Sequence, residues 1–111
     1  MRIHHVALRV QDLEAARAFY GGFLGLPELK RDGARSVWLR AGDAVLMLEQ
    51  NLRGKGPDEG SGHVLALAVD DLASWEEKLA LAGIAIEERT EHTLFVRDPD
   101  GHRVGLSVFE L

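Results

Sequence analysis

The segment HHVALRV at residues 4–10 has a close copy later in the chain, HVLALAV at residues 63–69. When the chain is aligned with itself without a gap, residue 4 matches residue 63, and the similarity runs from His4–Leu13 onto His63–Leu72. Self-similarity of this kind is typical of a duplicated supersecondary unit. We therefore expect two copies of one structural unit.

Both copies continue in the same order after this first strand. An aspartate that can cap a helix follows, at Asp12 and again at Asp71. Apolar residues then recur near the helical period, at Leu13, Ala16, Tyr20 and Phe23 in the first copy and at Leu72, Trp75 and Leu79 in the second. Gly25 and Gly83 fit the left-handed position that ends a helix. Three predicted strands complete each copy, at residues 28–31, 35–40 and 44–50, and at residues 85–89, 93–97 and 102–109.

The predicted fold class is α+β, with two βαβββ repeats at residues 1–50 and 63–111. Residues 51–62 are rich in glycine and charge and are expected to be a linker. One helix per repeat would cover one face of its sheet and leave the other face bare, so the two repeats are expected to form a mixed-sheet, half-barrel-like cavity with the helices outside. A chain of 111 residues fits a single domain, residues 1–111.

The composition excludes several classes of protein. Thirteen basic residues against 18 acidic ones give a net charge of −5, which disfavours a surface that follows phosphate backbones, so we expect no nucleic-acid partner. No apolar run approaches the roughly 20 residues that span a bilayer, so we expect no membrane partner. Cysteine is absent, which excludes thiolate chemistry and favours a cytoplasmic protein.

The period of two along a strand assigns side chains to the bare face that would line the cavity. In the first strand His5, Ala7 and Arg9 share this face. Trp38 and Phe95 occupy equivalent positions in the two copies and could form two aromatic walls. The expected ligand-binding residues are His5, Arg9, Trp38, Arg40, Met47, Glu49, Phe95, Arg97 and Ser107. The arginines on this face would need an anionic ligand, a carboxylate such as Glu49, or strand ends open to solvent.

The phrases HHVALRVQDLEAARAFYGGFLGL, GHVLALAVDDL and DPDGHRVGL, in this order on two βαβββ units, resemble the vicinal oxygen chelate superfamily. This superfamily includes glyoxalases, fosfomycin and bleomycin resistance proteins, and extradiol dioxygenases. The resemblance implies the fold over nearly the whole chain, a small-molecule ligand and a homodimer. Because members differ in chemistry, it does not fix the reaction.

In the metal-using members, the resemblance implies four ligands, one on the first and one on the last strand of each repeat. The first position falls on His5. The last-strand positions fall on Met47 and Gly105, a soft thioether and a residue without a side chain. The third falls on Val64, because His63 aligns with His4 rather than with His5. Because three of the four ligand positions carry residues that do not suit a metal, we expect a degenerate metal site and no cofactor.

A β-bulge could turn His63 toward the cavity, since a bulge absorbs one extra residue. His5, Glu49 and His63 could then hold a divalent metal such as Zn, Ni, Mn or Fe with two histidines and one carboxylate. In that case His5 and Glu49 are the candidate catalytic residues, and His5 is also the most plausible general base without a metal.

Two functions therefore remain open. The first is a protein of the glyoxalase/bleomycin-resistance type that binds a small aromatic or acidic molecule between the repeats without the standard metal site. The second is a metal-dependent lyase, isomerase or dioxygenase of the glyoxalase type that uses His5 and Glu49, with or without His63.

Overall fold

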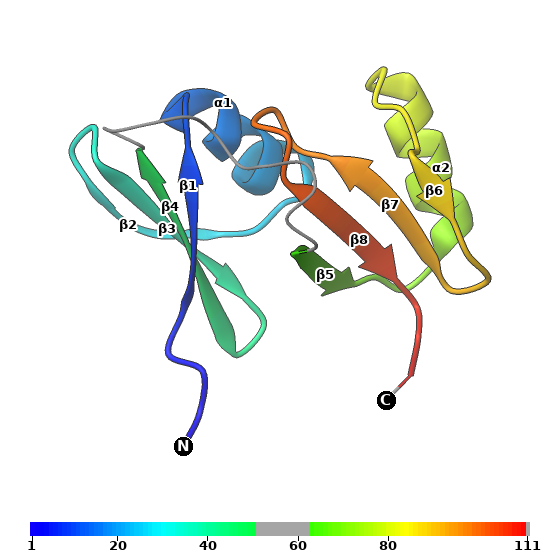
Figure 1. Ribbon diagram of the computed structural model, residues 1–111, viewed down its shortest axis with the longest axis horizontal. Coiled ribbons are helices and arrows are strands. Elements are labelled where there is room, and N and C mark those ends of the chain that lie inside the picture. The colour runs from blue at the N-terminus through cyan, green and yellow to red at the C-terminus, as the bar shows by residue number, and fades with distance from the viewer. Residues whose placement is uncertain (51–62, 111) are drawn as a thin grey trace. The chain divides into compact units, whose positions relative to one another are not determined.

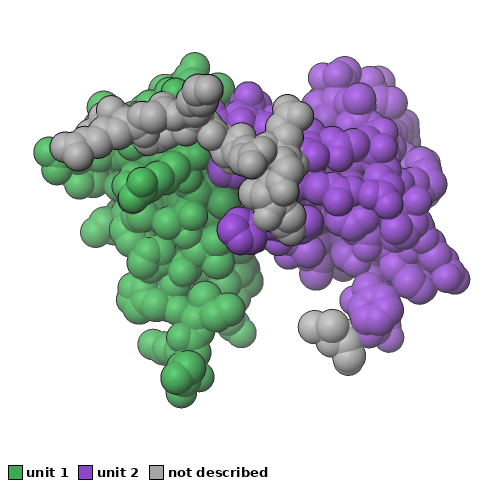
Figure 2. Space-filling view, viewed as in Figure 1, with its two compact units in different colours: residues 1–58 green, residues 59–111 purple. Residues whose placement is uncertain are grey.

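The computed structural model describes residues 1–50 and 63–110 of the chain. The chain divides into two compact units, residues 1–58 and residues 59–111 (Figure 2). The division falls inside the expected linker 51–62, which itself lies outside the described residues. The expectations that the chain is one domain and that the bare faces enclose one cavity stay predictions.

The first unit has the predicted βαβββ order. Its elements are β1 (Val6–Val10), α1 (Leu13–Arg17), a π-helix η1 (Ala18–Phe23), β2 (Glu28–Asp32), β3 (Ser36–Ala41) and β4 (Ala44–Gln50) (Figure 1). The sheet order is β1-β4-β3-β2, with β1 parallel to β4 and the other pairs antiparallel. The sheet is therefore mixed, as expected.

The second unit repeats this topology. Its elements are β5 (Val64–Ala68), α2 (Leu72–Leu81), β6 (Glu88–Arg89), β7 (Thr93–Arg97) and β8 (Arg103–Ser107) (Figure 1). The sheet order is β5-β8-β7-β6, and β5 runs parallel to β8. The prediction of a duplicated α+β unit is therefore confirmed.

Both helices begin where the aspartates predict. The Asp12 carboxylate accepts a hydrogen bond from Ala15 N at 3.1 Å. The Asp71 carboxylate accepts from Ala73 N at 2.9 Å and from Ser74 N at 3.2 Å. Each cap therefore satisfies backbone donors that have no partner inside the helix.

The end of α2 follows the glycine signal. Gly83 has φ 71°, in the left-handed region. Its N–H donates to Ala80 O at 3.1 Å, and the N–H of Ile84 donates to Leu79 O at 2.9 Å. This pair of hydrogen bonds is the Schellman arrangement, which needs a residue that tolerates positive φ at this position.

The first helix differs from the expected single α-helix. It changes at Ala18 into the π-helix η1, in which Leu24 N donates to Phe19 O at 2.8 Å, five residues back. Gly21 and Gly22 lie in this segment and weaken the preference for a regular α-helix. Phe19 and Tyr20 are both buried here, so the widened turn belongs to the packed core of the unit.

Two predicted strands are shorter than expected. The strand predicted at 85–89 is reduced to β6 at Glu88–Arg89, and the one predicted at 102–109 is reduced to β8 at Arg103–Ser107. The length of β8 matches that of β7, because all five residues of β7 pair with Arg103–Ser107. By contrast, β6 pairs with only two residues of β7, Phe95 and Leu94. The other predicted strands that follow the helices begin and end within one residue of the prediction, and the first strand begins two residues later than the segment at 4–10, at Val6.

In each sheet the alternate side chains on one face are buried. In the first unit these are Val37 and Leu39 on β3 and Leu46 and Leu48 on β4, and α1 packs against these two strands. In the second unit they are Leu94, Val96, Val104 and Leu106. A fully buried side chain of this kind contributes about 1.5–3 kcal/mol, so these faces are the core of each unit. The opposite face of each sheet carries the candidate functional residues.

Candidate functional site

Two rows of side chains cross the sheet of the first unit on the face opposite the core. Strand register places Ser36 opposite both Asp32 and Glu49, and Glu49 opposite Arg9. We call this the Ser36 row: Asp32, Ser36, Glu49 and Arg9. In the same way Trp38 is opposite both Lys30 and Met47, and Met47 is opposite Ala7. This is the Trp38 row: Lys30, Trp38, Met47 and Ala7.

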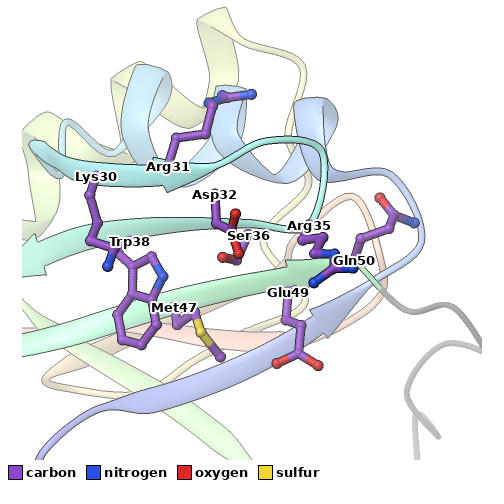
Figure 3. Close-up of a pocket in the computed structure, with 9 residues that line it drawn as sticks. All are labelled: Lys30, Arg31, Asp32, Arg35, Ser36, Trp38, Met47, Glu49 and Gln50. Atoms are coloured by element: carbon purple, nitrogen blue, oxygen red, sulfur yellow. The ribbon is translucent and has the colours of Figure 1, made fainter.

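A pocket of about 570 Å³ lies over these rows. Figure 3 shows its lining, which comes from β2, β3, β4 and the turn between β2 and β3: Lys30, Arg31, Asp32, Arg35, Ser36, Trp38, Met47, Glu49 and Gln50. A volume of this size fits a small organic molecule. All of these residues belong to the first unit.

The indole of Trp38 is the centre of an aromatic and cationic cluster. The His5 ring lies 5.0 Å from the Trp38 ring, centroid to centroid, and the Lys30 ammonium lies 5.7 Å from the same ring. The Nδ1 atoms of His4 and His5 are 2.9 Å apart. The structure thus brings His5 beside Trp38, on the side of the sheet that the alternation predicts.

Two lining residues, Arg31 and Gln50, hydrogen-bond to other parts of the first unit. Arg31 points toward the helix side in Figure 3, and its guanidinium donates to the Glu14 carboxylate at 2.6 Å. This hydrogen bond lowers the pKa of Glu14, with a smaller contribution from Arg17. The side-chain amide of Gln50 accepts from Leu13 N at 3.1 Å and donates to Gln11 O at 2.6 Å, so it fixes the start of α1.

The carboxylate of Glu49 lies 3.8 Å from the guanidinium of Arg9. Both side chains are partly exposed, so this ion pair is worth at most about 1 kcal/mol. By contrast, Lys30, Asp32 and Arg35 form no ion pair within residues 1–50 and 63–110. The pocket therefore presents one carboxylate and two cations that other described side chains do not neutralise.

The second unit carries an equivalent row with different chemistry. Phe95 is opposite Gly105, which is opposite Ala66, matching Trp38, Met47 and Ala7 of the first unit. A methyl group on Gly105 would lie 3.3 Å from the Phe95 ring. The Phe95 ring therefore fills the space in which a side chain at position 105 would lie.

The arginines of the second unit already have carboxylate partners. Arg97 forms a bidentate pair with Glu87, with nitrogen–oxygen distances of 2.5 and 2.9 Å. Hydrogen bonding to Arg97 lowers the pKa of Glu87. Arg103 hydrogen-bonds to Glu88, and its guanidinium carbon lies 4.3 Å from the Phe95 ring centre. The negative charge that these two arginines need is therefore supplied by the carboxylates of Glu87 and Glu88 in the same unit.

Ser107 also has partners within its unit. Its hydroxyl accepts from the Thr93 hydroxyl at 2.9 Å and from Phe109 N at 3.1 Å. These contacts tie β8 to β7 and to the segment that follows β8.

Whether the residues fit a metal can be judged from the donors. Glu49 is opposite Arg9, and His5 lies four residues before Arg9 along the chain. At about 3.3 Å per residue this separates the His5 and Glu49 backbones by roughly 13 Å, too far for one ion to bind both. Met47 and Gly105 supply no carboxylate at the last-strand positions. These residues do not fit the four-ligand site that the resemblance implies.

His63 immediately precedes β5 and is exposed. The register of β5 with β8 runs from Val64 to Ala68 without a shift, so the described strand contains no β-bulge. In the part of the chain that the structure describes, no three His, Cys, Asp or Glu side chains are grouped closely enough to hold an ion.

Of the expected ligand-binding residues, the pocket brings together Trp38, Met47 and Glu49. His5 and Arg9 contact its lining residues, and Arg40 lies on the same face, opposite Val45. Phe95, Arg97 and Ser107 lie in the second unit. The sequence reasoning missed the contribution of β2, because no face was assigned to that strand. Alternation over Lys30, Arg31 and Asp32 was the signal that could have placed Lys30 and Asp32 on one face, since the register of β2 is regular from Lys30 onward and shifts only between Glu28 and Lys30.

Comparison with known proteins identifies the family. A sequence model of the Glyoxalase/Bleomycin resistance protein/Dioxygenase superfamily matches residues 2–106. The chain belongs to this superfamily. A probable lactoylglutathione lyase of Vibrio cholerae is 32% identical, over 95% of this chain and 88% of the relative. A second probable lactoylglutathione lyase, of Vibrio parahaemolyticus, is 30% identical with the same coverage.

Solved structures agree with the fold. A glyoxalase/dioxygenase from Nostoc punctiforme superposes with a TM-score of 0.81 at 26% identity, covering 95% of this chain and 88% of that one. A fosfomycin resistance protein from Mesorhizobium loti superposes with a TM-score of 0.79 at 21% identity, covering 99% and 93%. The second likeness shows the fold alone. Among the described residues, no helix is long and apolar enough to cross a membrane.

Proposed function

We propose that this superfamily member binds a small aromatic or acidic molecule in the pocket beside Trp38, without the standard metal site of the metal-using members. One observation carries this proposal. The pocket places an indole and a thioether side by side, Trp38 opposite Met47, at the position where the resemblance implies a carboxylate ligand. An aromatic wall with a few polar groups around it is typical of organic-ligand pockets.

The donor set supports the same reading. Met47 is only 9% exposed, so its sulfur belongs to the apolar floor of the pocket. Thioethers are rare ligands for Zn, Ni, Mn or Fe(II), and Gly105 has no side chain to offer. His5 contacts the Trp38 ring and is available as a hydrogen-bonding group or a general base for a bound molecule.

The second candidate function is a metal-dependent lyase, isomerase or dioxygenase of the glyoxalase type that uses His5 and Glu49, with or without His63. The observation that favours it is the relationship to a Vibrio cholerae protein named as a probable lactoylglutathione lyase. The separation of His5 and Glu49 along the β1–β4 pair is the observation against it.

Binding can be tested through the fluorescence of Trp38. The chain contains two tryptophans, so a Trp75→Phe background leaves Trp38 as the only one. 3-Phenylpropanoate, which is both aromatic and acidic, is the probe. We expect this probe to quench the Trp38 fluorescence in a saturable manner. In a Trp38→Leu variant, where binding is measured by calorimetry, we expect the probe to bind more weakly. An absence of saturable binding at millimolar concentration, both for this probe and for L-phenylalanine, would contradict the proposal.

Isomerisation of the hemithioacetal of methylglyoxal and glutathione to S-lactoylglutathione, followed by the absorbance of the thioester that forms, separates the two functions. We expect no turnover above the uncatalysed rate with added Ni, Zn, Mn or Fe(II). Metal-dependent turnover that is lost in His5→Ala would favour the second candidate. We also propose that the protein is a cytoplasmic homodimer, and light scattering on the purified chain would test the assembly.

A further inference from the structure

Charge of both signs lies close together in the pocket. Lys30 and Asp32 are two residues apart on β2 and share one face, which separates their backbones by roughly 6.6 Å. Arg35 follows in the turn, where its N–H donates to Asp32 O at 2.9 Å. One small molecule can therefore reach a carboxylate and a cation at the same time.

The neighbours of Asp32 suit a positively charged group. Asp32 is opposite Ser36, which is only 7% exposed and lies at the floor of the pocket. In Figure 3 the Asp32 and Ser36 side chains lie together, between Trp38 on one side and Arg35 on the other. A carboxylate beside a hydroxyl offers acceptors for the several N–H donors of an ammonium group.

The other carboxylate of the Ser36 row is held differently. Glu49 lies 3.8 Å from Arg9, so its charge is partly balanced within the unit. Asp32 has no such partner among the described residues, and the same holds for the cations Lys30 and Arg35. The unbalanced charges of the pocket are thus one negative and two positive.

We propose that the ligand of this pocket is a zwitterion that carries an ammonium group, an acid group and an apolar or aromatic part. This inference rests on the proposed function and names the ligand class for the same site. The ammonium group pairs with Asp32 above the Ser36 hydroxyl. The acid group pairs with one of the two cations that flank Asp32, either Lys30 beside Trp38 or Arg35 in the turn, and the apolar part lies against Trp38 and Met47.

This arrangement selects by repulsion as well as by attraction. A molecule with only an acid group places its charge near the unpaired Asp32 carboxylate. A molecule with only an ammonium group meets Lys30 and Arg35. A zwitterion avoids both penalties, and discrimination of this kind depends on the unfavourable contacts made by the wrong ligand.

Three probes that share a phenyl ring test the charge requirement: L-phenylalanine, 2-phenylethylamine and 3-phenylpropanoate. Their dissociation constants are measured by Trp38 fluorescence in the Trp75→Phe background. We expect L-phenylalanine to bind roughly threefold or more tightly than either singly charged probe, since a partly exposed ion pair is worth up to about a fivefold change in affinity. The advantage should shrink at high salt.

Two variants assign the charges. Asp32→Asn should weaken the binding of L-phenylalanine and 2-phenylethylamine. The binding of 3-phenylpropanoate should be unchanged or tighter. The double substitution Lys30→Met and Arg35→Met should weaken the binding of L-phenylalanine and 3-phenylpropanoate. It should not weaken the binding of 2-phenylethylamine. Asp43→Asn is the matched control, because it makes the same substitution in the exposed turn between β3 and β4, outside the pocket lining.

The outcomes separate this inference from the proposed function. If 3-phenylpropanoate binds as tightly as L-phenylalanine and Asp32→Asn behaves like Asp43→Asn, the pocket binds molecules but the zwitterion proposal is wrong. If no probe gives saturable Trp38 quenching at millimolar concentration while the fold is intact by circular dichroism, both proposals are wrong.

Discussion

At the scale of single residues, Gly105 shows how a position can change its role between repeats. In the first unit the equivalent residue, Met47, fills space beside Trp38. In the second unit the Phe95 ring occupies that space, and a Cβ at position 105 would meet Thr93 and the Phe95 ring at 3.2–3.3 Å. The glycine is visible in the sequence, but the reason for it depends on which side chain lies opposite, and this comes from the strand register.

The packing around Gly105 predicts the effect of adding a methyl group. In Gly105→Ala the new Cβ would lie 3.2 Å from Thr93 Cγ2 and 3.3 Å from the Phe95 ring, both on stiff side chains. We expect a loss of about 1 kcal/mol in unfolding free energy, because overpacking outweighs the lower backbone entropy of alanine in the unfolded chain. Denaturant unfolding measures it. Thr93→Ser should restore part of the loss, and a fully stable Gly105→Ala would contradict this packing.

Glu87 makes stability depend on pH in a defined direction. Its pKa is lowered in the folded protein, chiefly by hydrogen bonding to Arg97. A lowered pKa stabilises the fold at pH values above the pKa of the unfolded state, about 4.3. This contribution is lost as the pH falls through the pKa of the folded state. Glu87→Gln should therefore reduce the melting temperature at pH 7 more than at pH 3.

The control for this pH effect is Glu77→Gln, since Glu77 is exposed on α2 and no partner of its side chain is described. The Glu77 variant should shift the melting temperature little at either pH. An equal loss at pH 7 and pH 3 in Glu87→Gln would contradict the role of its ionised form.

At the scale of elements, the aspartate caps were readable from the sequence because they act locally. Asp71 binds the backbone N–H groups of Ala73 and Ser74, within three residues of itself. We expect Asp71→Ala to cost about 1 kcal/mol of unfolding free energy, measured by denaturant unfolding. Asp70→Ala, one residue earlier and outside the helix, should cost much less. Equal effects of the two substitutions would show that the cap contributes nothing specific.

Other elements could be predicted only in part. Alternation along β3 and β4 was enough to place Trp38, Met47 and Glu49 on one face, because a period of two needs no knowledge of the partner strand. The widening of the first helix into η1 was not readable, since Gly21 and Gly22 permit it without requiring it. The pairing of Arg103 with Glu88 was also missed, because it depends on how β6, β7 and β8 are aligned across the sheet.

At the scale of the whole molecule, one duplicated framework carries two different sets of side chains. Both units have the same strand order, and the same three strands supply the central row of the bare face. In the first unit this row lines a pocket in which Lys30, Asp32 and Arg35 form no ion pair with another described side chain. In the second unit the arginines are paired with Glu87 and Glu88. The duplication was evident from the sequence, whereas this difference in charge balance required the structure.

The metal content of the protein tests the central claim most directly, because the metal site separates the two proposed functions. It is measured by plasma mass spectrometry on protein purified without a tag, before and after titration with Ni, Zn, Mn and Fe(II), and compared with His5→Ala. We expect no stoichiometric metal in either protein, since Met47 and Gly105 occupy the last-strand positions. Near-stoichiometric metal that disappears in His5→Ala would contradict the account.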